Sequence, residues 1–173
     1  FAREAVPNLF VVTLTEYEEG MRALAIFPKL TVSWPLAQVL GDEKLNHLHI
    51  AETQKYAHVT YFFNGGYADP IAGEARQVIP SPDVKSYDAT PAMSSKNLTK
   101  EVISNLTHNP LLSKERGNWK YDFTVLNLAA PDMIGHTGNL TAGVECCHKV
   151  DKYLGKIVKA YWRVGGTVLV TAD

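Results

Sequence analysis

The sequence has 173 residues, 46% of them hydrophobic and 10% aromatic, which is enough for one globular domain with a real core. Its 17 basic and 18 acidic residues give a formal net charge of −1, so the charge does not favour binding to nucleic acid or to an anionic membrane. No apolar run approaches the roughly 20 residues that span a bilayer, and the first residues lack a signal-peptide pattern. We therefore expect a soluble, cytoplasmic protein.

Taken in order, the chain predicts strands and helices in alternation. Apolar runs of strand length lie at residues 9–14, 47–50, 76–79, 123–128 and 167–172. Apolar residues at helical spacing, bounded by capping or helix-breaking residues, predict helices at 33–40, 52–63, 94–108 and 139–162. Ser33 is the expected N-cap of the first helix. Repeated connections from strand to helix to strand predict an α/β fold, with a parallel sheet and helices on both faces.

The longest predicted helix should bury one apolar stripe in the core. The stripe consists of Leu140, Val144, Cys147, Val150, Leu154, Ile157 or Val158, and Tyr161. Cys146 and Cys147 are adjacent, and on a helix their side chains diverge by about 100°, so they cannot form an ordinary disulfide. Two reduced thiols are consistent with a cytoplasmic protein.

Polar side chains follow the strand expected at 123–128. Pro131 breaks the apolar run and begins a loop that carries Asp132 and His136. In open α/β sheets, ligands bind outside the carboxyl ends of the strands, which is where this loop should lie. A carboxylate and an imidazole together suit a divalent cation such as Zn or Mn. The alternative is that Asp132 caps a turn and His136 is an ordinary surface residue.

Two more charged residues follow predicted strands. Lys55 lies in the first turn of the helix expected after strand 47–50, where the helix dipole prefers anions, so a cation there suggests another use. The alternative is a surface lysine whose methylene stem covers apolar surface. Asp173 ends the strand expected at 167–172. One parallel sheet would bring Lys55, Asp132, His136 and Asp173 to the same edge.

Several segments resemble the cofactor-independent (2,3-bisphosphoglycerate-independent) phosphoglycerate mutases of the alkaline phosphatase superfamily. The matching segments are Val125 to Asn139, Ile50 to Gly66, Ile79 to Val84, Ser86 to Asp88 and Gly165 to Asp173. Within the second segment, Gln54 and Tyr61 depart from the usual glutamate and phenylalanine. The matches lie in the right order across nearly the whole chain, so the resemblance is highly specific.

This resemblance implies a phosphatase-like domain and a mutase reaction. In the resembled family the residues matching Asp132 and His136 bind one of two Mn²⁺ ions, and the residue matching Asp173 binds the other. The residue matching Lys55 points at the phosphoryl group and the nucleophile. The implied reaction interconverts 3-phosphoglycerate and 2-phosphoglycerate in glycolysis through a phosphoserine, so the expected partner is a phosphoglycerate substrate.

The resemblance also implies that the chain is part of a larger protein, because members of the family are roughly three times as long and have two domains. We expect residues 1–173 to be an incomplete domain that lacks the phosphotransferase domain and the nucleophile segment. The isolated chain should be inactive and the parent enzyme monomeric. Two alternatives are another enzyme of the superfamily, such as a phosphopentomutase or a phosphatase, and a non-catalytic α/β binding domain.

Overall fold

The computed structural model describes residues 6–16, 20–27, 32–106 and 120–172. The chain divides into two compact units, Phe1–Ser33 and Trp34–Asp173. In the described part of the chain, no helix has both the length and the apolar character needed to cross a membrane.

The first unit contains one pair of very short strands. Strand β1 (Val12–Thr13) pairs in parallel with β2 (Leu24–Ala25). The predicted strand at 9–14 is therefore confirmed only at its centre. The remaining residues of that apolar run are not in a strand, although the carbonyl oxygens of Val11 and Leu14 accept hydrogen bonds from Leu24 N and Phe27 N.

The second unit is built on a three-stranded parallel sheet in the order β4-β3-β5. Its strands are β3 (His47–Glu52), β4 (Glu74–Ile79) and β5 (Phe123–Asn127). The central strand β3 is buried along its whole length. Its register opposite β4 places Glu52 beside Ile79, and opposite β5 it places Ala51 beside Asn127. The α/β class and the parallel sheet predicted from the sequence are confirmed.

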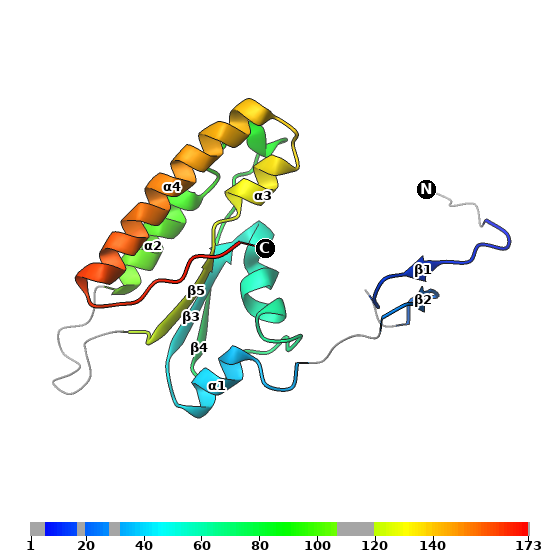
Figure 1. Ribbon diagram of the computed structural model, residues 1–173, viewed down its shortest axis with the longest axis horizontal. Coiled ribbons are helices and arrows are strands. Elements are labelled where there is room, and N and C mark those ends of the chain that lie inside the picture. The colour runs from blue at the N-terminus through cyan, green and yellow to red at the C-terminus, as the bar shows by residue number, and fades with distance from the viewer. Residues whose placement is uncertain (1–5, 17–19, 28–31, 107–119, 173) are drawn as a thin grey trace. The chain divides into compact units, whose positions relative to one another are not determined.

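Two helices, α2 (Ser95–Leu106) and α4 (Leu140–Arg163), pack side by side over one face of this sheet (Figure 1). The core between these helices and the sheet contains Leu48, Ile50, Ile79, Leu98, Val102 and Ile157. Five of these residues are at most 2% exposed, and burying an aliphatic side chain stabilises the fold by about 1.5 to 3 kcal/mol. This face of the sheet is therefore the main apolar core.

The opposite face of the sheet is covered by the helical segment that follows β3. It begins as a 3₁₀ turn, η1 (Thr53–Lys55), and continues as a π-helix, η2 (His58–Phe62). A helix was expected over 52–63, but the wider π turn changes which side chains face the sheet. Val59 is buried, whereas Phe62, expected on the buried side, is 62% exposed. The ring of Phe63 stacks on Phe123 of β5.

Two shorter helices differ from expectation. Helix α1 (Leu36–Asp42) has Pro35, not Ser33, at its N-cap, and it continues through Gly41. Helix α3 (Ala130–Gly135) occupies the segment expected to be a loop. Pro131 does not break this helix, because a proline in the first turn lacks only an N–H that would have no partner there. The remaining short element is the 3₁₀ turn η3 (Tyr87–Ala89).

The predicted core stripe of α4 is wrong at its amino end. Leu140, Val144 and Cys147 are exposed, and Cys146 is buried instead. Here α4 packs against α3, in a cluster with Ile134 and Ala142, so α3 determines which side is buried. Both cysteines are free, as expected. The strand expected at 167–172 is also wrong, because this segment pairs with no strand among the described residues and Leu169 is exposed.

Candidate active site

The carboxyl edge of the sheet brings together three of the four predicted site residues. Lys55 lies in η1 directly after β3, and Asp132 lies in the first turn of α3 directly after β5. Their side chains form an ion pair, with 2.6 Å between Lys55 Nζ and Asp132 Oδ2. The Lys55 side chain is only 12% exposed, whereas that of Asp132 is 47% exposed. The lysine is thus nearly enclosed while the carboxylate remains open to a ligand.

His136 lies one helical turn after Asp132 and caps the end of α3. Its Nε2 atom is 3.4 Å from Asp132 Oδ1, the carboxylate oxygen that does not contact Lys55. The hydrogen bond from Lys55, followed by the electrostatic influence of Lys55 and of the neighbouring imidazoles of His136 and His58, holds the pKa of Asp132 below its usual range. Asp132 is therefore an anion at neutral pH, with a lysine on one oxygen and an exposed imidazole beside the other.

These two donors fit a divalent metal as part of a larger ligand set. A carboxylate oxygen and an imidazole nitrogen are ligands that zinc, manganese and cobalt accept, and they lie close enough to share one ion. Within the described residues, no group of three or more His, Cys, Asp or Glu side chains could hold a metal. Asp173, the fourth predicted site residue, lies outside the described residues.

A buried carboxyl at the same edge was not singled out from the sequence. Glu52, the last residue of β3, is 0% exposed. Its Oε2 atom accepts hydrogen bonds from Ser94 N at 3.0 Å and Ser81 Oγ at 3.4 Å. Burial raises the pKa of Glu52 to about 7, against the lowering effect of these two hydrogen bonds. An acidic residue that follows Leu48 and Ile50 at the same alternating spacing is the signal that could have found it, because this spacing places it on their face of the strand.

A second set of ionisable groups is buried on the other face of the sheet, near the amino end of β3. We call it the histidine cluster, and it consists of His47, His49, Glu74 and Arg76. The two imidazoles contact each other, with 2.8 Å between His47 Nδ1 and His49 Nε2. His49 Nδ1 lies 2.6 Å from the carbonyl oxygen of Val59 and 3.5 Å from Glu74 Oε1. The cluster thereby ties η2 to the sheet.

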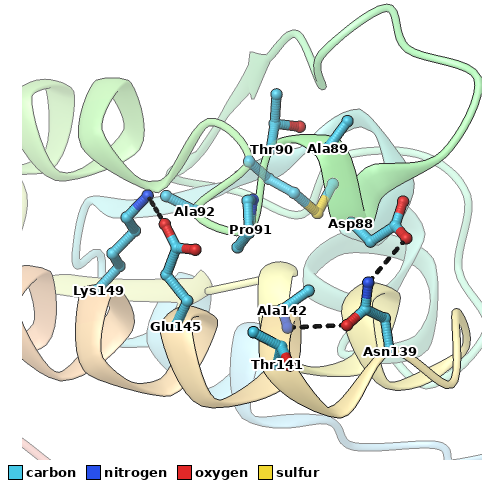
Figure 2. Close-up of a pocket in the computed structure, with 11 residues that line it drawn as sticks. Asp88, Ala89, Thr90, Pro91, Ala92, Asn139, Thr141, Ala142, Glu145 and Lys149 are labelled. Atoms are coloured by element: carbon cyan, nitrogen blue, oxygen red, sulfur yellow. Dashed lines mark hydrogen bonds and ion pairs between the residues drawn. The ribbon is translucent and has the colours of Figure 1, made fainter.

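A cavity of about 480 Å³ lies beside the first turns of α4, between that helix and the segment after η3 (Figure 2). Asn139, the N-cap of α4, accepts a hydrogen bond from Ala142 N and donates one to Asp88 Oδ2. Glu145 and Lys149 form an ion pair at its other end. Lys55, Asp132 and His136 do not line this cavity, so it is separate from the group around Lys55.

A parallel α/β sheet with an acidic and an imidazole side chain at its carboxyl edge is compatible with a metal-dependent α/β enzyme. The chain belongs to the Metalloenzyme superfamily, whose family model matches residues 28–173.

Sequence similarity to proteins of known name indicates which members of this superfamily the chain resembles. The chain is 43% identical over 166 residues to a 2,3-bisphosphoglycerate-independent phosphoglycerate mutase of Chloroflexus aggregans, covering 96% of this chain and 29% of that protein. The corresponding protein of a Cyanothece strain is 42% identical over 173 residues, covering 100% and 31%. The chain thus spans less than a third of the length of these relatives.

A solved structure supports the same grouping. Leishmania mexicana phosphoglycerate mutase, crystallised at low cobalt concentration, matches with a TM-score of 0.72 and 29% sequence identity. The match covers 90% of this chain and 27% of that one. The recognition made from the sequence motifs is confirmed at the level of the family and the fold.

Proposed function

We propose that this chain is part of a phosphoglycerate mutase that interconverts 3-phosphoglycerate and 2-phosphoglycerate, with residues 1–173 forming part of its phosphatase-like domain. The observation that carries the proposal is the group formed by Lys55, Asp132 and His136. Segments far apart in the sequence bring these three side chains to one sheet edge, and the relatives that cover 96% and 100% of the chain at more than 40% identity are named as mutases. The cytoplasm is the proposed location.

In this proposal Asp132 and His136 supply two ligands of one divalent metal site, and Asp173 supplies a ligand of a second. Bound there, two metal ions, which we expect to be Mn²⁺, would clamp the oxygens of a phosphoryl group during in-line displacement. Lys55 would hold its positive charge toward that phosphoryl group. One preorganised charge aimed at a transition state contributes about 2.7 to 4 kcal/mol, so Lys55 is assigned a catalytic role.

Metal binding by the chain itself tests the ligand assignment. Titration with Co²⁺, followed by visible absorption, should show weak binding because the described part of the site has only two ligands. Asp132→Asn and His136→Ala should each weaken that binding by at least about tenfold. His148→Ala is the matched control, because His148 is an exposed histidine on α4 and should leave the affinity unchanged. Equal affinity in all four proteins would contradict the assignment.

The reaction is tested by placing this chain in a complete relative. A chimera of the C. aggregans protein, with its matching segment replaced by residues 1–173, should turn over 3-phosphoglycerate. Lys55→Ala should lower that turnover by about a hundredfold or more, and Lys152→Ala, on the exposed side of α4, should not change it. Lys55→Arg should restore little, since a planar guanidinium does not replace a compact ammonium. The isolated chain should be inactive, and turnover by it would contradict the proposal.

A further inference from the structure

The three residues before Lys55 each bind a different atom of the segment between β4 and α2. Glu52 Oε2 accepts the hydrogen bond from Ser94 N. The next residue, Thr53, accepts one on Oγ1 from Ser81 N at 3.3 Å. Gln54 Nε2 then donates to the phenol oxygen of Tyr87 at 2.8 Å. The start of η1 is thus held at three successive positions, immediately before the chain reaches Lys55.

Glu52 is the buried anchor of this group, and its burial needs an explanation. Its side chain lies on the apolar face of β3, with Leu48 and Ile50, and among the described residues no cation pairs with it. Burying a polar group without compensation costs several kcal/mol, whereas an aliphatic side chain would fill the same space favourably. Only one of its two oxygens is used, since Oε1 has no hydrogen-bond partner in the described structure. Stability of the core alone therefore does not account for a glutamate here.

The hydrogen bonds of Glu52 explain why a glutamate is buried here, because they hold neighbouring segments in place. Ser94, whose N–H binds Glu52, also donates its hydroxyl to the carbonyl oxygen of Pro80 at 2.6 Å. One carboxyl oxygen thus connects the end of β3, the residues that leave β4 and the residues that enter α2. The first and middle parts of this connection also contact η1 directly, through Ser81 on Thr53 and Tyr87 on Gln54. The long, flexible side chain of Lys55 can hold one position beside Asp132 only if the backbone from which it extends is fixed.

We propose that Glu52 is a positioning residue for Lys55, acting through the hydrogen bonds that fix η1 between β4 and α2. It is not a catalytic residue, because its fully buried carboxyl contacts no solvent and cannot touch a substrate. The proposal that Glu52 positions Lys55 rests on the described geometry alone. Its importance for catalysis rests on the function proposed above.

The test measures how well the amine of Lys55 is held. A short pulse of an amine-acylating reagent, read by mass spectrometry of peptides, gives the labelling rate of Lys55 relative to the exposed Lys152 of the same molecule. Glu52→Ala should raise this ratio by about fivefold or more, which corresponds to the loss of one typical hydrogen bond. Glu52→Gln keeps an acceptor for Ser94 N and should stay near the wild-type ratio.

A matched control separates positioning from stability. Val102 is a buried core residue of α2 that is remote from η1 in the chain, so Val102→Ala should destabilise the fold and leave the Lys55 ratio unchanged. All variants are labelled under conditions in which circular dichroism shows them fully folded. A wild-type ratio in Glu52→Ala, or an equal rise in Val102→Ala, would overturn the proposal.

Tyr87→Phe keeps the inference testable if Glu52→Ala does not fold. It removes only the phenol oxygen that Gln54 binds, and Tyr87 is partly exposed, so folding should survive. The Lys55 ratio should rise by about twofold, and an unchanged ratio would count against the proposal. In the chimera, Glu52→Ala should lower kcat while KM changes little. Altered Lys55 labelling in a chimera that never turns over 3-phosphoglycerate would support the role of Glu52 and overturn the mutase assignment.

Discussion

Both faces of β3 carry buried ionisable side chains, but only one face gives them counter-charges. In the histidine cluster, burial alone would raise the pKa of Glu74, yet hydrogen bonds from Arg76, Ile71 N and Asn64, and then the nearby His49, hold that pKa below its usual value. For Glu52 on the other face, burial outweighs two hydrogen bonds and the pKa rises to about 7. The partners available to each carboxyl therefore contribute to the opposite directions of the two pKa shifts.

This contrast gives the two faces different roles. The histidine cluster is a compensated network that joins the sheet, η2 and the turn before β4. Arg76 extends it by donating a hydrogen bond to the carbonyl oxygen of Ala68 at 2.7 Å. Glu52 has no such compensation, so its protonation should change near neutral pH. The following predictions compare these two groups with each other and with the exposed site, in order of decreasing expected effect.

Glu74→Ala should cause the largest loss in the free energy of unfolding. Removing this carboxylate leaves the guanidinium of Arg76 without its counter-charge and His49 without its carboxylate neighbour, and breaking a buried pair costs about 3 to 5 kcal/mol of unfolding free energy. Urea unfolding at pH 7, followed by circular dichroism, measures it. Glu43→Ala, at an exposed residue after α1, is the control and should change little. A loss below about 1 kcal/mol for Glu74→Ala would show that the cluster is not a linked network.

Glu52→Gln should alter the dependence of stability on pH. The folded-state pKa of Glu52, about 7, lies above its unfolded value of 4.5, so its contribution is complete below pH 4.5 and is lost as the pH rises through 7. The full loss is at most about 3 kcal/mol. Glutamine does not titrate, so the stability of the variant relative to wild type should increase from pH 4.5 to pH 8. Parallel stability curves for the two proteins would refute the prediction.

Asp132→Asn should have a smaller effect on stability, because its ion pair with Lys55 involves a half-exposed carboxylate. Such pairs contribute less than about 1 kcal/mol, so the free energy of unfolding should change by no more than that. Labelling of the Lys55 amine should nevertheless increase, since its partner has lost its charge. A large destabilisation would place Asp132 with the histidine cluster, as a structural residue, and would weaken the case for a ligand role.

Glu145→Gln should have the smallest effect on stability. Glu145 and Lys149 form an ion pair one turn apart on the surface of α4, with Lys149 Nζ 2.6 Å from Glu145 Oε1. Solvent and salt screen such a pair, so thermal unfolding should show no measurable change between the two proteins. A clear change in the melting temperature would mean that the cavity beside α4 depends on this pair.

The sequence predicted the sheet and two of its helices well because their patterns are local. The apolar residues of strands β3 and β5 and the regular spacing of α2 were sufficient. The predicted convergence of Lys55, Asp132 and His136 is confirmed as geometry, because parallel strands end at one edge. Their ligand and catalytic roles remain predictions, as does the role of Asp173, which lies outside the described residues.

What the sequence did not predict depends on tertiary contacts. The buried side of the first turns of α4 is set by α3, which is why Cys146 and not Cys147 is in the core. Glu52 lies within a motif that was recognised by resemblance, and the sequence did not indicate a separate role for it. The role proposed here depends on its hydrogen bond with Ser94, which lies 42 positions later in the chain. Residues 167–172 have a strand-like composition, but strands form in pairs, and composition alone does not supply a neighbour.

The π-helix η2 affects which changes in chain length this region can accept. A π turn holds about one more residue than an α turn, and each completes a single rotation. Losing one residue between His58 and Phe62 should therefore leave the two ends of the segment in nearly the same orientation. Lys55 and Asn64, which are anchored on either side of η2, could then keep their contacts. A single-residue deletion should be tolerated better here than in a regular α-helix such as α4, where it would rotate the two sides by about 100° relative to each other.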